Sequence, residues 1–202
     1  MIIGITGGTG CGKTTALDAI RELGGTVVDC DAVYHQLLKT DKGLLAAIEQ
    51  RFPGTVTENI LDRKKLGSIV FSDKQALLDL NTITHNAVRQ EVLRILDSGF
   101  TLAAVDAIEL FDGGLSQLCH TTVAITAPEE DRITRLLQRD NITREQALLR
   151  IRAQKSESYF RSMCDHVLEN TGTQAQFHEK CLAFFRRITI MEENTTNKEI
   201  KL

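Results

Sequence analysis

The chain has 202 residues, enough for about one domain with an insertion, and its 42% hydrophobic and 25% charged residues exclude wholesale disorder or a fibrous repeat. A net charge of −3 argues against a protein built mainly to coat nucleic acid, which is normally basic. The five cysteines lack zinc-site spacing, and the apolar stretches are too short to cross a membrane. We therefore expect a reduced, cytoplasmic protein that binds neither nucleic acid nor a membrane.

The start of the chain is predicted to form a strand, a glycine loop, a helix and a second strand. Ile2–Thr6 is an apolar run, Thr14–Leu23 has apolar residues at helical spacing, and Thr26–Cys30 is a β-branched run. Gly24 and Gly25 end the helix. Because parallel neighbours need a crossover, this strand–helix–strand unit predicts an α/β fold with a parallel sheet.

A long helical segment then delays the next strand. The elements expected in it are helices at 31–38, 44–52, 62–71 and 73–96, with a turn at Thr57-Glu58-Asn59 before the third helix. An interruption of this length predicts a helical insertion over residues 31–99. Its two possible roles are binding a second substrate and packing.

The remainder of the chain returns to alternating strands and helices. Strands are predicted at 102–105, 121–126 and 166–168, and helices at 129–139, 143–161 and 173–190. The predicted domains are a nucleotide-binding core (1–30, 100–128 and 162–190), the insertion (31–99), an arginine-rich lid region (129–161) and a polar tail (191–202).

The glycine loop carries the strongest functional pattern. Gly7 to Thr14 reads Gly-Gly-Thr-Gly-Cys-Gly-Lys-Thr and matches G-x-x-x-x-G-K-[ST]. Its backbone N–H groups can wrap a phosphate, Lys13 can reach the β- and γ-phosphates, and the Thr14 hydroxyl can bind Mg²⁺. The strand before and the helix after favour this over a plain glycine turn. The expected nucleotide contacts are Gly8, Thr9, Gly10, Cys11, Gly12, Lys13, Thr14 and Thr15. For Cys11, a small space-filling residue is favoured over a redox role.

Carboxylates follow the predicted strands. Asp29 and Asp31 come at the end of the second strand, on the edge where open α/β sheets bind ligands. Position alone leaves Asp31 as either a helix N-cap or a base that takes a proton from an attacking hydroxyl. Asp106 ends another apolar run and is either a Mg²⁺ ligand through water or a strand-end cap. His85, in the insertion, is by position more typical of a structural histidine than of a metal ligand.

Arg132, Arg135 and Arg139 lie near one face of a predicted helix. Such a face is either a solvated basic surface or a mobile arm whose arginines stabilise the charge of a phosphate in transfer.

Several segments from Ile3 to about Gly172 resemble the dephospho-coenzyme A kinase family. They include the phosphate loop, Val27-Val28-Asp29-Cys30-Asp31, Asp62-Arg63-Lys64-Lys65-Leu66, Leu80-Asn81-x-Ile83-x-His85, Asp106-Ala107-Ile108-Glu109-Leu110-Phe111-Asp112, Arg139-Asp140, Ala153-Gln154 and Asp165-x-Val167-Leu168-x-Asn170-x-Gly172. The chain departs from the family pattern at Cys11, where the family usually has Ser, at Tyr34-His35 for Ala-Arg, and at Asn86 and Ile108 for Pro.

The resemblance implies that ATP phosphorylates the ribose 3′-hydroxyl of dephospho-coenzyme A. We expect Mg²⁺ as the cofactor, from the phosphate-loop pattern, and a monomer or small homo-oligomer. The resemblance also implies Asp31 as the base, His85 and Arg63 near the acceptor, Arg139 as the lid arginine, and Asn170 and Gly172 near the adenine. The alternatives are another small-molecule kinase, for shikimate or a nucleoside monophosphate, and a degenerate relative that binds ATP without catalysis.

Overall fold

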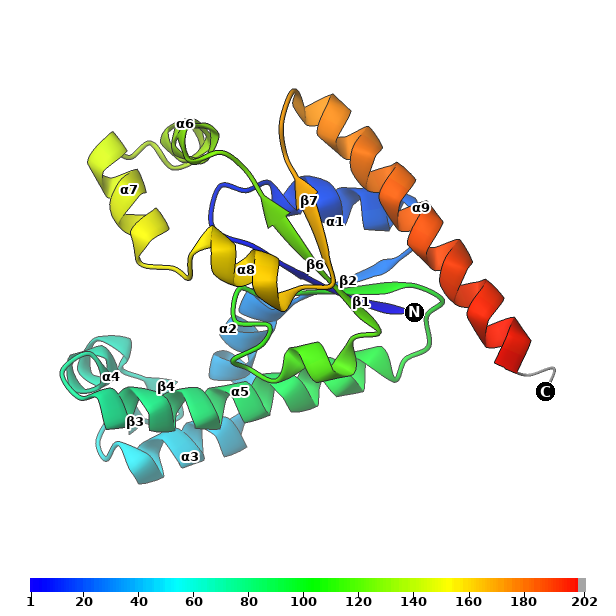
Figure 1. Cartoon of the computed structure of the whole chain (residues 1–202). Helices are drawn as coiled ribbons and strands as arrows, with labels where there is room; N and C mark the ends of the chain where they lie inside the picture. The colour runs from blue at the N-terminus through cyan, green and yellow to red at the C-terminus, as the bar shows by residue number, and fades with distance from the viewer. Residues whose placement is uncertain (200–202) are drawn as a thin grey trace. The chain divides into compact units, whose positions relative to one another are not determined.

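The computed structural model describes the backbone of residues 1–199 and the side chains of residues 1–190 (Figure 1). The chain divides into two compact units. The core unit contains Met1–Val27, Gly99–Phe111 and the chain from Leu115 onward, and the helical unit contains Val28–Ser98 and Asp112–Gly114. The separate roles expected for the parts of the chain stay predictions.

A five-stranded sheet, in the order β2-β5-β1-β6-β7, forms the centre of the fold. Its strands are β1 (Ile2–Thr6), β2 (Thr26–Asp29), β5 (Ala103–Asp106), β6 (Thr121–Thr126) and β7 (His166–Glu169). Strand β1 pairs in parallel with β5 and β6, and β6 pairs in parallel with β7. The predicted α/β fold with a central parallel sheet is therefore confirmed.

The core unit buries its apolar side chains between the sheet and two helices. Helices α1 (Lys13–Glu22) and α9 (Gln174–Glu199) pack against each other, as Figure 1 shows in blue and orange to red. Ile5, Ile20 and Phe185 from the sheet and both helices are fully buried in one cluster. Each such side chain stabilises the fold by about 1.5–3 kcal/mol. This cluster fixes β1 and α1, and hence both ends of the loop between them.

Helix α9 continues to Glu199, so the helix end predicted at Ile190 is wrong. Residues 200–202 of the predicted polar tail lie outside the described residues. Over the part that the structure describes, no helix combines the length and apolar character needed to cross a membrane.

The arginine-rich region forms three helices, α6 (Glu129–Asp140), α7 (Arg144–Arg152) and α8 (Glu157–Met163). The single helix predicted at 143–161 is wrong, because the side chain of Ser156 accepts the Tyr159 N–H at 3.2 Å and starts a new helix. We refer to α6 and α7, residues 129–152, as the arm. The arm has a small apolar core of its own, made of Ile133, Leu136, Ala147 and Ile151.

The helical unit consists of α2 (Cys30–Thr40), α3 (Lys42–Arg51), α4 (Arg63–Val70), α5 (Lys74–Leu96) and a hairpin. The hairpin strands are β3 (Val56–Thr57) and β4 (Ile60–Leu61), where the sequence predicts a turn alone. Glu58 and Asn59 between them have φ of 52° and 62°, which is the geometry of a two-residue hairpin turn.

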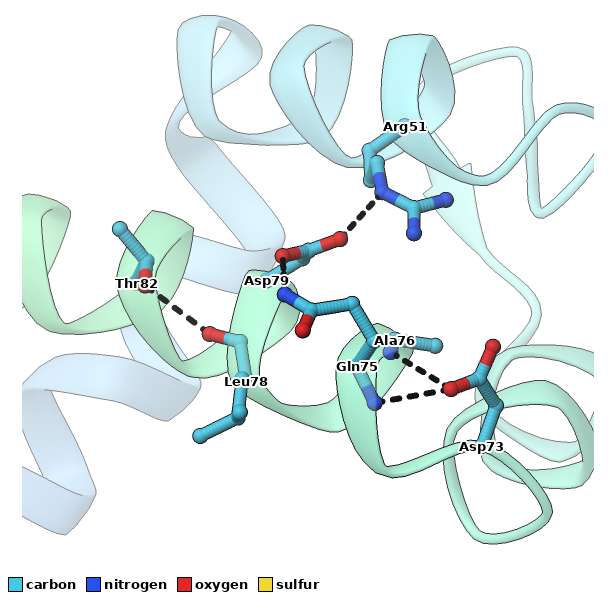
Figure 2. A network of polar contacts seen from close by, with 7 residues as sticks. All are labelled: Arg51, Asp73, Gln75, Ala76, Leu78, Asp79 and Thr82. Carbon is cyan, nitrogen blue, oxygen red and sulfur yellow. Dashed lines mark hydrogen bonds and ion pairs between the residues drawn. The ribbon is translucent and has the colours of Figure 1, made fainter.

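A polar network ties α3 to α5 (Figure 2). The Asp79 carboxylate accepts from Arg51 Nε at 2.6 Å and from Gln75 Nε2 at 2.8 Å, and Asp73 caps the start of α5. The hydrogen bond from Gln75, followed by that from Arg51, lowers the pKa of Asp79. The network orients the two helices more than it stabilises them, because solvent screens ion pairs between exposed side chains.

Candidate active site

The loop between β1 and α1 leaves backbone donors available for a ligand. Gly12 is the N-cap of α1, with φ 94°, and offers no side-chain cap to the first N–H groups of the helix. A helix start of this kind presents N–H groups and a partly positive dipole end to an anion. The local geometry therefore fits the phosphate-binding role predicted for residues 7–14.

Neighbouring groups enclose the loop closely, and Gly10 and Gly12 show how little room its glycines have for a side chain. A Cβ on Gly10, whose φ is 76°, would lie 2.8 Å from the backbone oxygen of Arg132. A Cβ on Gly12 would collide with the side-chain amide of Asn170. Both positions therefore require glycine for space as well as for backbone conformation.

Lys13 and Thr14 begin helix α1 at the end of the loop. The Lys13 ammonium donates to the Gly7 carbonyl at 3.0 Å, so it lies between the two ends of the loop. The Thr14 side chain is exposed, whereas Thr15 is buried. These placements suit an ammonium that contacts phosphate and a hydroxyl that binds Mg²⁺.

Cys11 is buried within the loop, 3% exposed. Burial raises the pKa of its thiol, although the charges of Arg132 and Lys13 act in the opposite direction. A thiol held in its neutral form is a poor nucleophile, which favours the space-filling interpretation over a redox role.

The donors available for a metal fit Mg²⁺ held mainly by a substrate. Among the described residues, no cluster of three or more His, Cys, Asp or Glu is placed to hold a metal ion. Magnesium commonly keeps several waters and binds one or two protein oxygens plus substrate phosphates. The Thr14 hydroxyl is such an oxygen, and Asp106 is the last residue of β5, opposite Ile5 of β1 in the sheet register.

Two arginines of the arm bind the loop backbone. Arg132, 7% exposed, donates from Nε to the Thr9 carbonyl at 2.9 Å, and Arg135 donates from Nη1 to the Gly10 carbonyl at 3.1 Å. Arg139 instead forms a two-pronged ion pair with Asp140, at 2.7 and 2.9 Å. The predicted arginine face is thus divided between loop contacts and an ion pair, and Arg132 is not part of a solvated surface.

Two amide side chains hold the loop from other segments. Gln154 Oε1 accepts the Thr9 N–H at 2.7 Å, and Asn170 Nδ2 donates to the Cys11 carbonyl at 2.9 Å. Sequence reasoning missed the contacts of Arg132 and Gln154, since no local pattern links them to residues more than a hundred positions away. The adenine contacts expected of Asn170 and Gly172 stay predictions.

In the helical unit, Asp29 and not Asp31 caps helix α2. The Asp29 carboxylate accepts the Ala32 N–H at 2.9 Å. Asp31 is exposed in the first turn of the helix. The N-cap alternative for Asp31 is therefore wrong, and its expected role as a base stays a prediction.

The residues expected near the acceptor lie on different helices of the same unit. Arg63 is the exposed first residue of α4, and His85 is half-buried on α5. Burial raises the pKa of the Tyr34 phenol, and the charge of Arg63 offsets part of that rise. Tyr34, one of the departures from the family pattern noted in the sequence, thus places an aromatic ring within the influence of Arg63.

The sheet order, the glycine loop and the uncapped helix start together define a phosphate-loop kinase fold. A shikimate kinase from Bacteroides thetaiotaomicron shares this fold, with a TM-score of 0.53 at 16% identity over 93% of this chain and 97% of that one.

A family model described as dephospho-CoA kinase matches residues 1–176. The dephospho-CoA kinase of Bacillus licheniformis is 32% identical over 189 residues, which cover 89% of this chain and 94% of the relative. The crystal structure of TT1252 from Thermus thermophilus has a TM-score of 0.78 at 34% identity, over 93% of this chain and 96% of that one. The chain belongs to the dephospho-CoA kinase family.

Proposed function

We propose that the protein catalyses ATP-dependent phosphorylation of dephospho-coenzyme A in coenzyme A synthesis, and that the acceptor atom is the ribose 3′-hydroxyl. The observation that carries the proposal is the loop from Gly7 to Lys13, with its uncapped helix start, in a chain whose family match covers residues 1–176.

At the nucleotide end, the loop N–H groups and the Lys13 ammonium bind and orient the β- and γ-phosphates. The contacts to ATP extend over Gly8–Thr15, with Asn170 and Gly172 near the adenine. Thr14, and Asp106 through water, would hold a Mg²⁺ ion together with the phosphates, and the ion would neutralise phosphate charge. Arg139 leaves its ion pair with Asp140 and stabilises the negative charge on the phosphoryl oxygens during transfer.

At the acceptor end, Asp31 accepts the proton of the 3′-hydroxyl while the hydroxyl oxygen attacks the γ-phosphorus. The bond between the γ-phosphorus and the bridging oxygen breaks, and ADP leaves with that electron pair. Arg63 and His85 bind the acceptor. In this proposal the enzyme is a monomer or small homo-oligomer of the cytoplasm, where its five free cysteines stay reduced.

Two rival functions make different demands on the same site. A shikimate or nucleoside monophosphate kinase would use the same loop with a different acceptor, and the likeness to shikimate kinase extends to the fold alone. A degenerate relative would bind ATP without turnover. Lys13, Thr14, Asp31 and Arg139 are all present, which supports a working enzyme.

A coupled assay of ADP release, run separately with dephospho-coenzyme A, shikimate, several nucleoside monophosphates and water, distinguishes these functions. We expect turnover with dephospho-coenzyme A and about the rate of the water control with the others. Turnover only with shikimate or a nucleoside monophosphate would show that dephospho-coenzyme A is not the acceptor. ATP binding without turnover on any acceptor would support the degenerate relative.

A further inference from the structure

Both polar groups of the Thr9 backbone are bound by side chains from outside the loop. Its carbonyl accepts from Arg132 Nε at 2.9 Å, and its N–H donates to Gln154 Oε1 at 2.7 Å. The donating guanidinium is charged, and hydrogen bonds to charged groups are stronger than neutral ones. Thr9 therefore has its orientation fixed from both sides within the loop.

Arg132 lies near the start of the arm, and Gln154 lies just beyond its end. Arg132 is in the first turn of α6, and Gln154 follows the last residue of α7 by two positions. Between them, α6 and α7 pack on their own small apolar cluster around Leu136 and Ile151. The arm therefore has an apolar cluster of its own, and the residues near its start and just after its end both contact Thr9.

Gly8 shows how closely these side chains approach the loop. A Cβ on Gly8 would lie 2.5 Å from Arg132 Nη2 and 3.3 Å from Gln154 Oε1. The guanidinium is also buried. The contact is therefore a packed one, in which a shift of the loop requires a shift of both side chains.

We propose that Arg132 and Gln154 are positioning residues that set the shape of the phosphate loop through Thr9 and couple the arm to ATP binding. ATP that orders the loop then also orders the arm, which carries Arg139. The reverse holds as well, because two events coupled through one element favour each other equally. This inference rests on the proposed use of the loop for ATP.

The test compares Gln154→Ala with the wild type in steady-state kinetics and in amide hydrogen exchange. Loss of one hydrogen bond to the loop should raise KM for ATP about three- to tenfold while KM for dephospho-coenzyme A stays the same. In the wild type, saturating ATP should slow exchange in residues 133–152. In Gln154→Ala that ATP-dependent protection should fall by at least half.

Gln146→Ala is the matched control. Gln146 caps α7 on the same arm, where its side chain accepts the Thr143 N–H at 3.0 Å. Its loss should therefore speed exchange at the start of α7 and leave KM for ATP and the ATP-dependent protection intact. Gln154→Glu keeps an oxygen that can accept the Thr9 N–H and should retain the protection. A variant Arg132→Met should act in the same direction as Gln154→Ala.

Wild-type KM and protection in Gln154→Ala would overturn the proposal, as would an equal loss of protection in Gln146→Ala. Wild-type turnover with dephospho-coenzyme A, measured in the same series, tests the proposed function separately. Its absence together with normal ATP-dependent protection would refute the acceptor and leave the coupling in place.

Discussion

The side-chain amide of Asn170 donates a hydrogen bond to the backbone carbonyl of Cys11 at 2.9 Å, in a buried contact. Asn170 directly follows β7, so this bond joins the end of that strand to the phosphate loop. The same amide occupies the space beside Gly12 that a Cβ would need. Asn170 therefore holds the phosphate loop in place before any nucleotide is bound.

Asn170→Ala should lower the free energy of unfolding in the absence of ATP. The substitution leaves the Cys11 carbonyl buried without its donor, which costs about 1–3 kcal/mol. Urea denaturation of the nucleotide-free protein measures the loss. Asn170→Asp should lower the free energy of unfolding more than Asn170→Ala does, because its negative carboxylate would face the partly negative carbonyl oxygen of Cys11. Unchanged stability in both variants would leave Asn170 with the expected adenine contact alone.

Asp31→Asn should reduce kcat for dephospho-coenzyme A by about 10²–10⁴-fold, the usual contribution of a positioned base. The dissociation constant for ATP, measured by calorimetry, should stay within about twofold of wild type, since no charge in the phosphate loop changes. A normal kcat would remove Asp31 from the mechanism.

Asp29→Asn is the control for this change. It removes a carboxylate two residues away, yet asparagine caps a helix about as well as aspartate, so the cap on Ala32 is retained. We expect near wild-type turnover. An equal loss of turnover in Asp29→Asn and Asp31→Asn would mean that the negative charge of this segment matters, and not Asp31 in particular.

The strands of the central sheet and the phosphate loop were predictable because their signals are local. Ile2–Thr6 and Thr121–Thr126 are short apolar runs that end before Gly7 and before Ala127-Pro128, and both strands have the predicted bounds. The break between α7 and α8 could also have been predicted, since serine is a residue type that often caps the start of a helix, as Ser156 does here.

The contacts that shape the loop were not predictable from one sequence. Gln154 reaches Thr9 from 145 positions away, and Arg132 reaches it from 123. No pattern in their own segments shows that their partner is Thr9, because the tertiary fold decides which side of a helix meets the loop. Which residue caps α2 was ambiguous for a simpler reason. Asp29 and Asp31 are the same residue type, two positions apart, and either could cap a helix that begins there.

Asp165 should make stability depend on pH. It accepts from the Thr122 side chain and backbone at 2.8 Å each, and these bonds, the side-chain one first, lower its pKa. A lowered folded-state pKa stabilises the fold above the unfolded pKa of about 3.9, and this stabilisation is lost as pH falls through the folded value.

Asp165→Asn should therefore cost about 1 kcal/mol at pH 7, since the carboxylate is exposed and its charged hydrogen bonds are weakened by solvent. The difference in free energy of unfolding between this variant and the wild type should shrink toward pH 3. Chemical denaturation at both pH values measures it. An equal difference at the two values would mean that the charge of Asp165 contributes nothing.

Arg139 and Arg150 share one partner and therefore form a matched pair of substitutions. Both guanidinium groups bind Asp140, at 2.7 and 2.6 Å, and the hydrogen bond from Arg139 is the main cause that lowers the pKa of Asp140. Each substitution to Ala leaves Asp140 one cation, so their structural effects should be alike. If Arg139 stabilises the phosphoryl group in transfer, Arg139→Ala should lower kcat by about 10²-fold or more, with a smaller change in KM for ATP, while Arg150→Ala stays near wild type. Steady-state kinetics with dephospho-coenzyme A compares them, and equal losses would assign the effect to Asp140 and the shape of the arm.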